Sequence, residues 1–317
     1  MKGLLLVLCL VSAQAFSYEY TKQYSGQTFK LEEQRNCEAE YVKITDALGT
    51  LPGFIVFDGY CKPIGQNHLQ IVFNYESPIT ETIDKYEYQF ATQSACENQA
   101  MLGAQVMNSE KDIVVAAYCS GSRYNLHYVD YSHSMIRELR LGAEFKSLKS
   151  CQTQMSEISK MVSKQGMSTL LKECREFKSL KGDKGYKASF FYRGIFSKSL
   201  EVINTRIVKN DCLDQEINIE RGFSDANIDL TYKFCDDEVG YSQANEILIY
   251  LDPTGGSFSG LVKNYQGVMY TDLQVCLDKK DEVIAKFAKI NRLAVYSYCN
   301  EVRKGSFIPS IYYVNKK

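Results

Sequence analysis

The spacing of the cysteines constrains this chain more than any other feature of its sequence. The chain has 317 residues and 11 cysteines, and Cys9 lies in an apolar N-terminal run. The other ten form five pairs whose members are 24, 23, 23, 23 and 23 residues apart: Cys37/Cys61, Cys96/Cys119, Cys151/Cys174, Cys212/Cys235 and Cys276/Cys299. Successive pairs begin 59, 55, 61 and 64 residues apart, which is typical of a repeat protein. We predict that each pair is a disulfide that closes its own module of about 60 residues.

The residues between the two cysteines of a pair follow one pattern. Apolar residues recur at i, i+4, i+7 and i+11 from the first cysteine, which predicts an amphipathic helix of about three turns. The third pair has the stripe Cys151, Met155, Ile158 and Val162. Lys280 interrupts this stripe in the fifth pair, and the fourth pair is only loosely periodic, with Leu213, Ile217 and Ile219. Apolar strand patterns precede the helix and follow it, so each module is expected to be strand, helix, strand, strand.

The expected topology brings the paired cysteines together. A strand-helix-strand crossover within one sheet makes its two strands parallel, and we expect these strands to be neighbours. The first cysteine follows the end of one strand and the second lies at the end of the other, so both reach one edge of the sheet. Each bridge would stabilise its module by roughly 3.5 kcal/mol in the chain-entropy model. The alternative of reduced cysteines that bind zinc is disfavoured because no CxxC motif occurs.

The predicted fold class is therefore α+β, with five tandem repeats at 16–80, 81–133, 134–197, 198–256 and 257–317. Two packings fit this pattern: an array in which each repeat contacts its neighbours, or a closed ring. Regrouped by one strand, the repeat reads strand, strand, helix, strand, and its arrangement resembles the five-bladed α/β propeller of the pentein family. In such a ring, a strand near 307–314 would complete a sheet with one near 28–31. The resemblance concerns arrangement alone and implies no function.

The N-terminus indicates export. Residues 1–15 have the form of a secretory signal peptide, with Lys2, an apolar run at 4–11 and the small-x-small sequence Ala13-Gln14-Ala15. The mature chain is expected to be secreted or periplasmic, where disulfides persist, and the absence of an Asn-x-Ser/Thr sequon fits a bacterial envelope protein. No later stretch is apolar enough to predict a transmembrane segment. A net charge of −1 argues against nucleic-acid binding.

No trusted catalytic or cofactor motif is present, and we predict no cofactor and no metal. Pentein enzymes use a nucleophilic cysteine, but each mature cysteine here has a predicted disulfide partner. The three histidines are His68, His127 and His133, and the last two could share a metal, although surface histidines are more common. An acidic turn at 236–238 could bind calcium, but a solvated turn is the simpler interpretation.

Two sets of residues are candidate binding residues. The loop from Lys172 to Lys187 has six basic and three acidic residues, a net charge of +3, which could bind an anionic polysaccharide or lipid headgroup. Its candidates are Lys178, Lys181, Lys184 and Lys187. Tyr124 and Tyr128 are candidates because exposed tyrosines contact sugars and proteins. A solvated loop and ordinary strand tyrosines are the alternatives.

The sequence favours a non-enzymatic binding or structural repeat protein of the bacterial envelope or cell exterior. Its partner would be a protein or a polysaccharide that the sequence does not identify. The alternatives are a secreted hydrolase with two carboxylates, which leave no motif, or an inhibitor of a secreted enzyme. A hydrolase should have one module that departs from the others around a deep pocket with clustered acids, whereas a binder should have an exposed face rich in Tyr or Lys.

Overall fold

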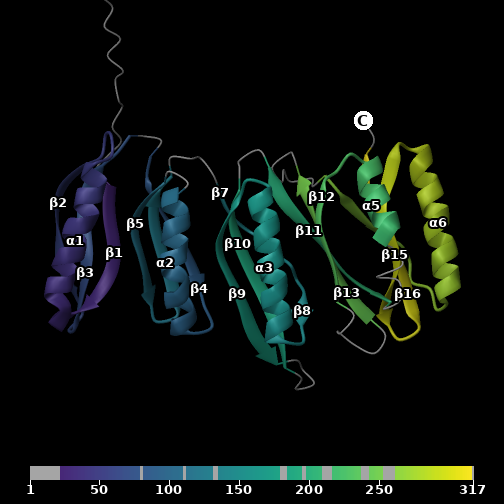
Figure 1. Ribbon diagram of the computed structural model, residues 1–317, viewed down its shortest axis with the longest axis horizontal. Helices are drawn as coiled ribbons and strands as arrows, with labels where there is room; N and C mark the ends of the chain where they lie inside the picture. Colours follow the sequence, from purple (N-terminus) through teal and green to yellow (C-terminus); the bar gives the residue numbers. More distant parts are fainter. Residues whose placement is uncertain are drawn as a thin grey trace, which may run out of the picture. The chain divides into compact units, whose positions relative to one another are not determined.

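A computed structural model of the chain describes residues 22–78, 81–109, 112–130, 135–178, 184–194, 198–208, 216–236, 243–252 and 261–315. The described residues form five α-helices and five small antiparallel sheets, a mixed α+β architecture rich in strands (Figure 1). The predicted signal peptide lies outside the described residues. No described helix has the length and apolar character needed to cross a membrane.

The first sheet shows the topology of the three-stranded sheets. It contains β1 (Lys22–Lys30), β2 (Ile55–Ile64) and β3 (His68–Glu76), with α1 (Gln34–Gly49) between β1 and β2 in the chain. The short 3-10 helix η1 (Leu31–Glu33) precedes α1. The strand order is β1-β3-β2, and β3 is antiparallel to both neighbours. We call a sheet and its helix a module.

Three of the other sheets repeat this order with their third strand in the centre, whereas the third sheet has four strands, of which the last in the chain pairs with the other three. The second module contains β4 (Ile83–Gln89), α2 (Gln93–Ser109), β5 (Ile113–Ser120) and β6 (Arg123–Val129). The third contains β7 (Met135–Glu138), β8 (Glu144–Phe145), α3 (Leu148–Lys164), β9 (Ser168–Lys178) and β10 (Lys184–Gly194). The fourth contains β11 (Ser199–Val208), α5 (Glu216–Asp225), β12 (Leu230–Asp236) and β13 (Gln243–Asp252). The fifth contains β14 (Lys263–Gln266), α6 (Leu273–Lys289), β15 (Arg292–Arg303) and β16 (Ser306–Asn315).

Two topological expectations were wrong. The strands that flank a helix run in the same direction but are not neighbours, because the hairpin after the second strand places the third strand between them. The pairing of 307–314 with 28–31 that the ring alternative requires does not occur, since β16 pairs with β14 and β15, and β1 pairs with β3. The described strands form five separate sheets, and none of these closes into a ring.

Four of the five predicted cysteine pairs lie entirely within the described residues, and each of them is a disulfide that joins a helix to the strand that follows it. The half-cystines have Cα–Cα distances of 6.1, 6.1, 6.1 and 6.2 Å in Cys37–Cys61, Cys96–Cys119, Cys151–Cys174 and Cys276–Cys299. The first cysteine of each pair is the fourth residue of its helix. Cys235 is also disulfide-bonded, whereas Cys212 lies outside the described residues. Each of these disulfides therefore links the first turn of a helix to a strand.

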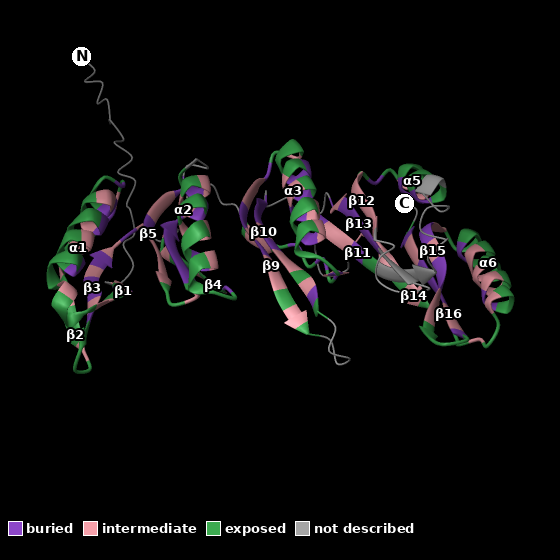
Figure 2. Ribbon diagram, turned by 60° about the horizontal axis from the view of Figure 1, so that its bottom comes forward, coloured by how far each residue is buried: buried purple, intermediate pink, exposed green. Residues whose placement is uncertain are grey.

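The chain divides into two compact units. Unit 1 is Met1–Ala100 with Met107–Ser132, and unit 2 is Met101–Val106 with His133–Lys317. In unit 1, α1 buries Cys37, Ile44 and Leu48 in a cluster with the inner face of β3. The same cluster includes Val115 and Val129 of the second sheet, so α1 packs between two sheets. The side of each helix that faces away from these contacts carries exposed residues (Figure 2).

In unit 2, α3 buries the predicted stripe Cys151, Met155, Ile158 and Val162, together with Met161. This stripe shares a cluster with Ile247 and Ile249 of the fourth sheet. Helix α5 in turn shares a cluster with β15 of the fifth module. Helices α1, α3 and α5 thus each contact both their own sheet and the next sheet along the chain.

Candidate functional site

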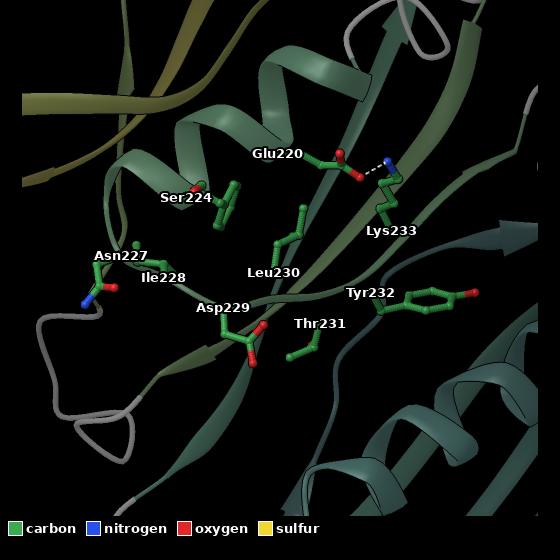
Figure 3. A pocket seen from close by; sticks show the side chains of 10 residues that line it. Glu220, Ser224, Asn227, Ile228, Asp229, Leu230, Thr231, Tyr232 and Lys233 are labelled. Carbon is green, nitrogen blue, oxygen red and sulfur yellow. Dashed lines mark hydrogen bonds and ion pairs between the residues drawn. The ribbon is translucent and has the colours of Figure 1, made fainter.

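A groove of about 610 Å³ opens between α5 and β12 in the fourth module (Figure 3). One side is formed by α5 and the turn after it, with Glu220, Phe223, Ser224 and Asn227. The other side is the continuous run of residues 228–233. The groove therefore follows a strand and combines apolar and polar side chains.

The groove exists because α5 packs away from its own second strand. Helices α1, α3 and α6 pack against β2, β9 and β15, the strands that follow them in the chain. Helix α5, by contrast, contacts β12 slightly and packs mainly on β15. A Cβ atom on Gly222 would lie 2.2 Å from the backbone oxygen of Val295, so only glycine permits this approach. Ile219 and Phe223 are buried on the same side of α5. The helix is thereby held toward the fifth module, and β12 is left open on its α5 side.

The groove runs along the edge of β12 rather than over one face of the sheet. Neighbouring side chains of a strand point to opposite faces, yet Leu230 and Thr231 both line the groove. In Figure 3, Leu230 and Lys233 point toward α5, and Asp229 and Thr231 point to the other side of the strand. Among the described strands β12 pairs with β13 alone, so it is an edge strand of its sheet. An edge strand turns alternate N–H and C=O groups of its backbone away from the other strands of its sheet.

One pair of charged side chains in the groove forms an ion pair, whereas another charged side chain is exposed. The Lys233 ammonium lies 2.6 Å from the Glu220 carboxylate and is the more buried partner. The Asp229 side chain is exposed, and its backbone oxygen accepts a hydrogen bond from Leu251 N at 3.0 Å. The C-terminal turn of α5 carries no basic residue. The Asn227 end of the groove is therefore negative, because the helix dipole adds to the Asp229 charge.

The far side of β12 is anchored to the third module. The Tyr232 hydroxyl donates a hydrogen bond to Gln154 of α3, and burial raises the pKa of this tyrosine. Thr231 donates its hydroxyl hydrogen bond to Ile249 O at 2.9 Å. Ile228 and Phe223 form a buried apolar floor. These contacts hold the edge strand in place without covering it.

The predicted basic loop is largely neutralised where it is described. The Lys184 ammonium lies 3.1 Å from Glu176, and the Lys187 ammonium lies 3.3 Å from Glu144. Lys187 also lies 4.6 Å from the ring centroid of Phe177. Lys178 is exposed, and Lys181 lies outside the described residues. The β9–β10 hairpin thus presents mixed charge, with a weaker positive field than the sequence alone indicates.

The two candidate tyrosines are buried, which corrects their predicted exposure. Tyr124 and Tyr128 are 0% and 8% exposed and lie on β6, the central strand of the second sheet. Burial raises the pKa of Tyr124, and its hydroxyl lies 3.4 Å from Ala100 O. Strand propensity indicated that these tyrosines lie on a strand, but not that the strand is central.

The histidines give no metal site in the described residues. His127 is buried, and its Nδ1 atom lies 2.7 Å from the Tyr24 hydroxyl of the first module. Burial, with a smaller effect of Lys85, lowers the pKa of His127 to about 4. His133 lies outside the described residues, and no three His, Cys, Asp or Glu side chains that are described could share a metal ion. His127 has a packing role between two modules.

A smaller cavity of about 330 Å³ lies between α5, α6 and β15. It is lined by Lys280, the residue that interrupts the predicted stripe of α6, and by Tyr296. The Tyr296 hydroxyl donates a hydrogen bond to the buried Glu246 of β13. This cavity marks the side of α5 opposite the groove, where the helix meets the fifth module.

Sequence reasoning did not select any residue of the groove. The one sequence signal was the weak helical pattern of the fourth module, which also contains Gly222 inside its helix. No family model, curated protein or solved structure matches this chain. The chemistry of the groove itself is therefore the basis for a functional interpretation.

Proposed function

We propose that this chain is an exported, non-enzymatic binding protein of the bacterial envelope or cell exterior that holds a partner protein in the α5–β12 groove. The observation that carries the proposal is the displacement of α5 onto β15, which leaves an edge strand open beside a mixed apolar and polar groove. Binding sites on proteins commonly combine an apolar floor with a few placed polar groups. Phe223 and Ile228 supply the floor, and Asp229 and Asn227 supply exposed polar groups.

The disulfides support the proposed compartment and the rigidity of the binding surface. Four bridges fasten helices to sheets, and such bridges persist in oxidising compartments. A small helix-on-sheet module buries little core, so a covalent staple keeps its surface preformed. A preformed surface loses less conformational freedom when it binds.

The geometry favours binding over hydrolysis in this groove. A two-carboxylate hydrolase needs both carboxylates on one scissile bond. The Glu220 carboxylate is paired with Lys233 and lies on the α5 side of β12, whereas Asp229 points to the opposite side (Figure 3). The two groups therefore do not converge. An inhibitor of a secreted enzyme remains a special case of the proposed function, in which the partner is an enzyme.

Site-specific photo-crosslinking in the producing cells tests the proposal. A benzoyl-phenylalanine residue is introduced at Ser224, which is exposed and lines the groove. The matched control carries it at Ser163, an exposed serine of α3 that does not line the groove. We expect a discrete protein adduct from position 224 and none from position 163. Equal adducts from both positions, or none from position 224, would reject the groove as a binding site.

A further inference from the structure

We propose that the partner binds by strand addition: an extended peptide segment pairs with β12 and becomes a fourth strand of the sheet β11-β13-β12. This inference rests on the proposed function and names its mode of recognition. Edge strands bind extended peptides through main-chain hydrogen bonds, and pockets for alternate side chains provide specificity. The groove offers both features, because it runs along an edge and has different side chains above and below the strand.

The backbone of β12 is suited to accept a short strand. The run Tyr232–Asp236 pairs regularly with β13, and a register shift occurs between Leu230 and Tyr232. A bulge of this kind interrupts regular pairing, so the added segment should be short and its register defined at this point. By contrast, the edge strand β2 of the first module carries Pro63, which has no N–H group to donate to an added strand.

The side chains of the groove specify an alternating ligand. On the α5 side, the half-buried Leu230 provides apolar contact area above the buried Phe223 and Ile228. On the other side, the exposed Asp229 carboxylate lies near the negative end of α5. Because adjacent residues of an added strand point to opposite sides, an apolar residue toward α5 would be followed by a residue toward Asp229. The segment should therefore alternate apolar and basic residues.

A set of synthetic peptides tests this recognition on the full mature chain. The probes are blocked, fluorescein-labelled peptides that alternate Val with Lys, and matched peptides that alternate Val with Glu. We expect the Val/Lys peptide to bind at least about tenfold more tightly than the Val/Glu peptide in fluorescence anisotropy. The Asp229→Lys variant should remove this preference. Equal binding of both peptides, or no binding of either, would overturn the inference.

Backbone N-methylation distinguishes strand addition from simple side-chain contact. Methyl groups on alternate residues of the Val/Lys peptide remove either the N–H groups at the edge that pairs with β12 or the N–H groups at the opposite, outward edge. We expect one methylation register to weaken binding about tenfold and the other to change it less than about twofold. Equal effects of the two registers would contradict strand addition.

Two tryptophan variants place the peptide in the groove. Ser224→Trp fills the groove and should weaken binding at least about tenfold, whereas Ser163→Trp on α3 should leave it unchanged. Circular dichroism checks that both variants fold. If neither variant changes binding, the peptide binds elsewhere and the inference fails.

Sedimentation of the wild-type chain tests a second copy as the occupant. A dimer that Ser224→Trp dissociates would show that β12 pairs with β12 of another chain, which also overturns a heterologous peptide. The photo-crosslinking result remains separate from these outcomes. An adduct at position 224 without peptide binding would retain the proposed function and reject strand addition, whereas no adduct would reject the function itself.

Discussion

The third and fourth modules both belong to unit 2, yet their helices pack differently. Helix α3 has 17 residues and buries five side chains, mainly against β9 and β10 of its own sheet. Helix α5 has 10 residues, and its closest approach is to β15 of the next module at Gly222. The third module is consequently closed over its sheet, whereas the fourth has an open groove.

This difference shows how similar topologies can produce both a structural module and a binding module. A helix with a complete apolar stripe, such as α3, packs mainly on its own sheet and also contacts the next one. A helix with an incomplete apolar stripe and a glycine, such as α5, loses part of the contact with its own sheet and packs on the next sheet instead. The strand that loses contact with its helix, β12, then borders an open groove.

The largest predicted effect concerns the disulfide of the third module. The double variant Cys151→Ala, Cys174→Ala should lower the free energy of unfolding by about 3.5 kcal/mol, because the bridge no longer restricts the unfolded chain. Urea unfolding followed by circular dichroism measures this loss. The control Cys276→Ala, Cys299→Ala removes a bridge of the same separation, 23 residues, and should cost about as much. A loss below about 1 kcal/mol for the third module alone would show that the apolar stripe of α3 stabilises the module without the disulfide.

Truncation of one core isoleucine in each helix sharpens the comparison. Ile158→Ala in α3 should lower the free energy of unfolding by about 3 kcal/mol, since this side chain is fully buried in a dense cluster. Ile219→Ala in α5 should cost less, about 2 kcal/mol, because Ile219 already borders the 330 Å³ cavity and loses fewer contacts. The same urea titration compares them. If Ile219→Ala is the more costly variant, α5 is packed as tightly as α3 and the comparison is wrong.

Gly222→Ala tests the close approach of α5 to β15. The added methyl group would overlap the Val295 backbone oxygen, so the variant should lose about 2 kcal/mol of stability or shift α5 toward β12. Hydrogen exchange of the α5 and β12 amides reports the shift. Gly49→Ala at the end of α1 is the matched control, since no atom lies within 4 Å of its added Cβ, and it should lose nothing. Equal stability of the two variants would remove the steric reason for the groove.

The smallest effect is expected at the ion pair of the groove. Lys233→Met should change the free energy of unfolding by about 0.5 kcal/mol, because the Glu220 partner is largely exposed to water and salt. The matched variant in the third module is Lys160→Met, which removes the exposed pair with Glu157 at 2.8 Å. Both differences should shrink in high salt. A loss above about 2 kcal/mol for Lys233→Met would mean that the pair is buried and that the groove is closed in solution.

The sequence alone was sufficient to predict the disulfides within the modules and the buried face of a helix. Cysteine spacing predicted the four bridges that the structure describes, and the apolar stripe of α3 predicted its buried face, because both depend on residues close in the chain. The common direction of the strands that flank a helix also followed from the crossover. Whether the modules arose as five copies of one repeat stays a prediction.

The tertiary structure alone decided which strands are neighbours, and the candidate site depends on that choice. Periodicity indicates which face of a strand is buried, but it contains no information about lateral order, since that order is set by hydrogen bonds between distant segments. Tyr124 and Tyr128 are buried because β6 is the central strand of its sheet, whereas β12 is an edge strand with one neighbour among the described strands. The position of α5 likewise depends on a contact between Gly222 and Val295, which lie in different modules and meet only in the folded chain.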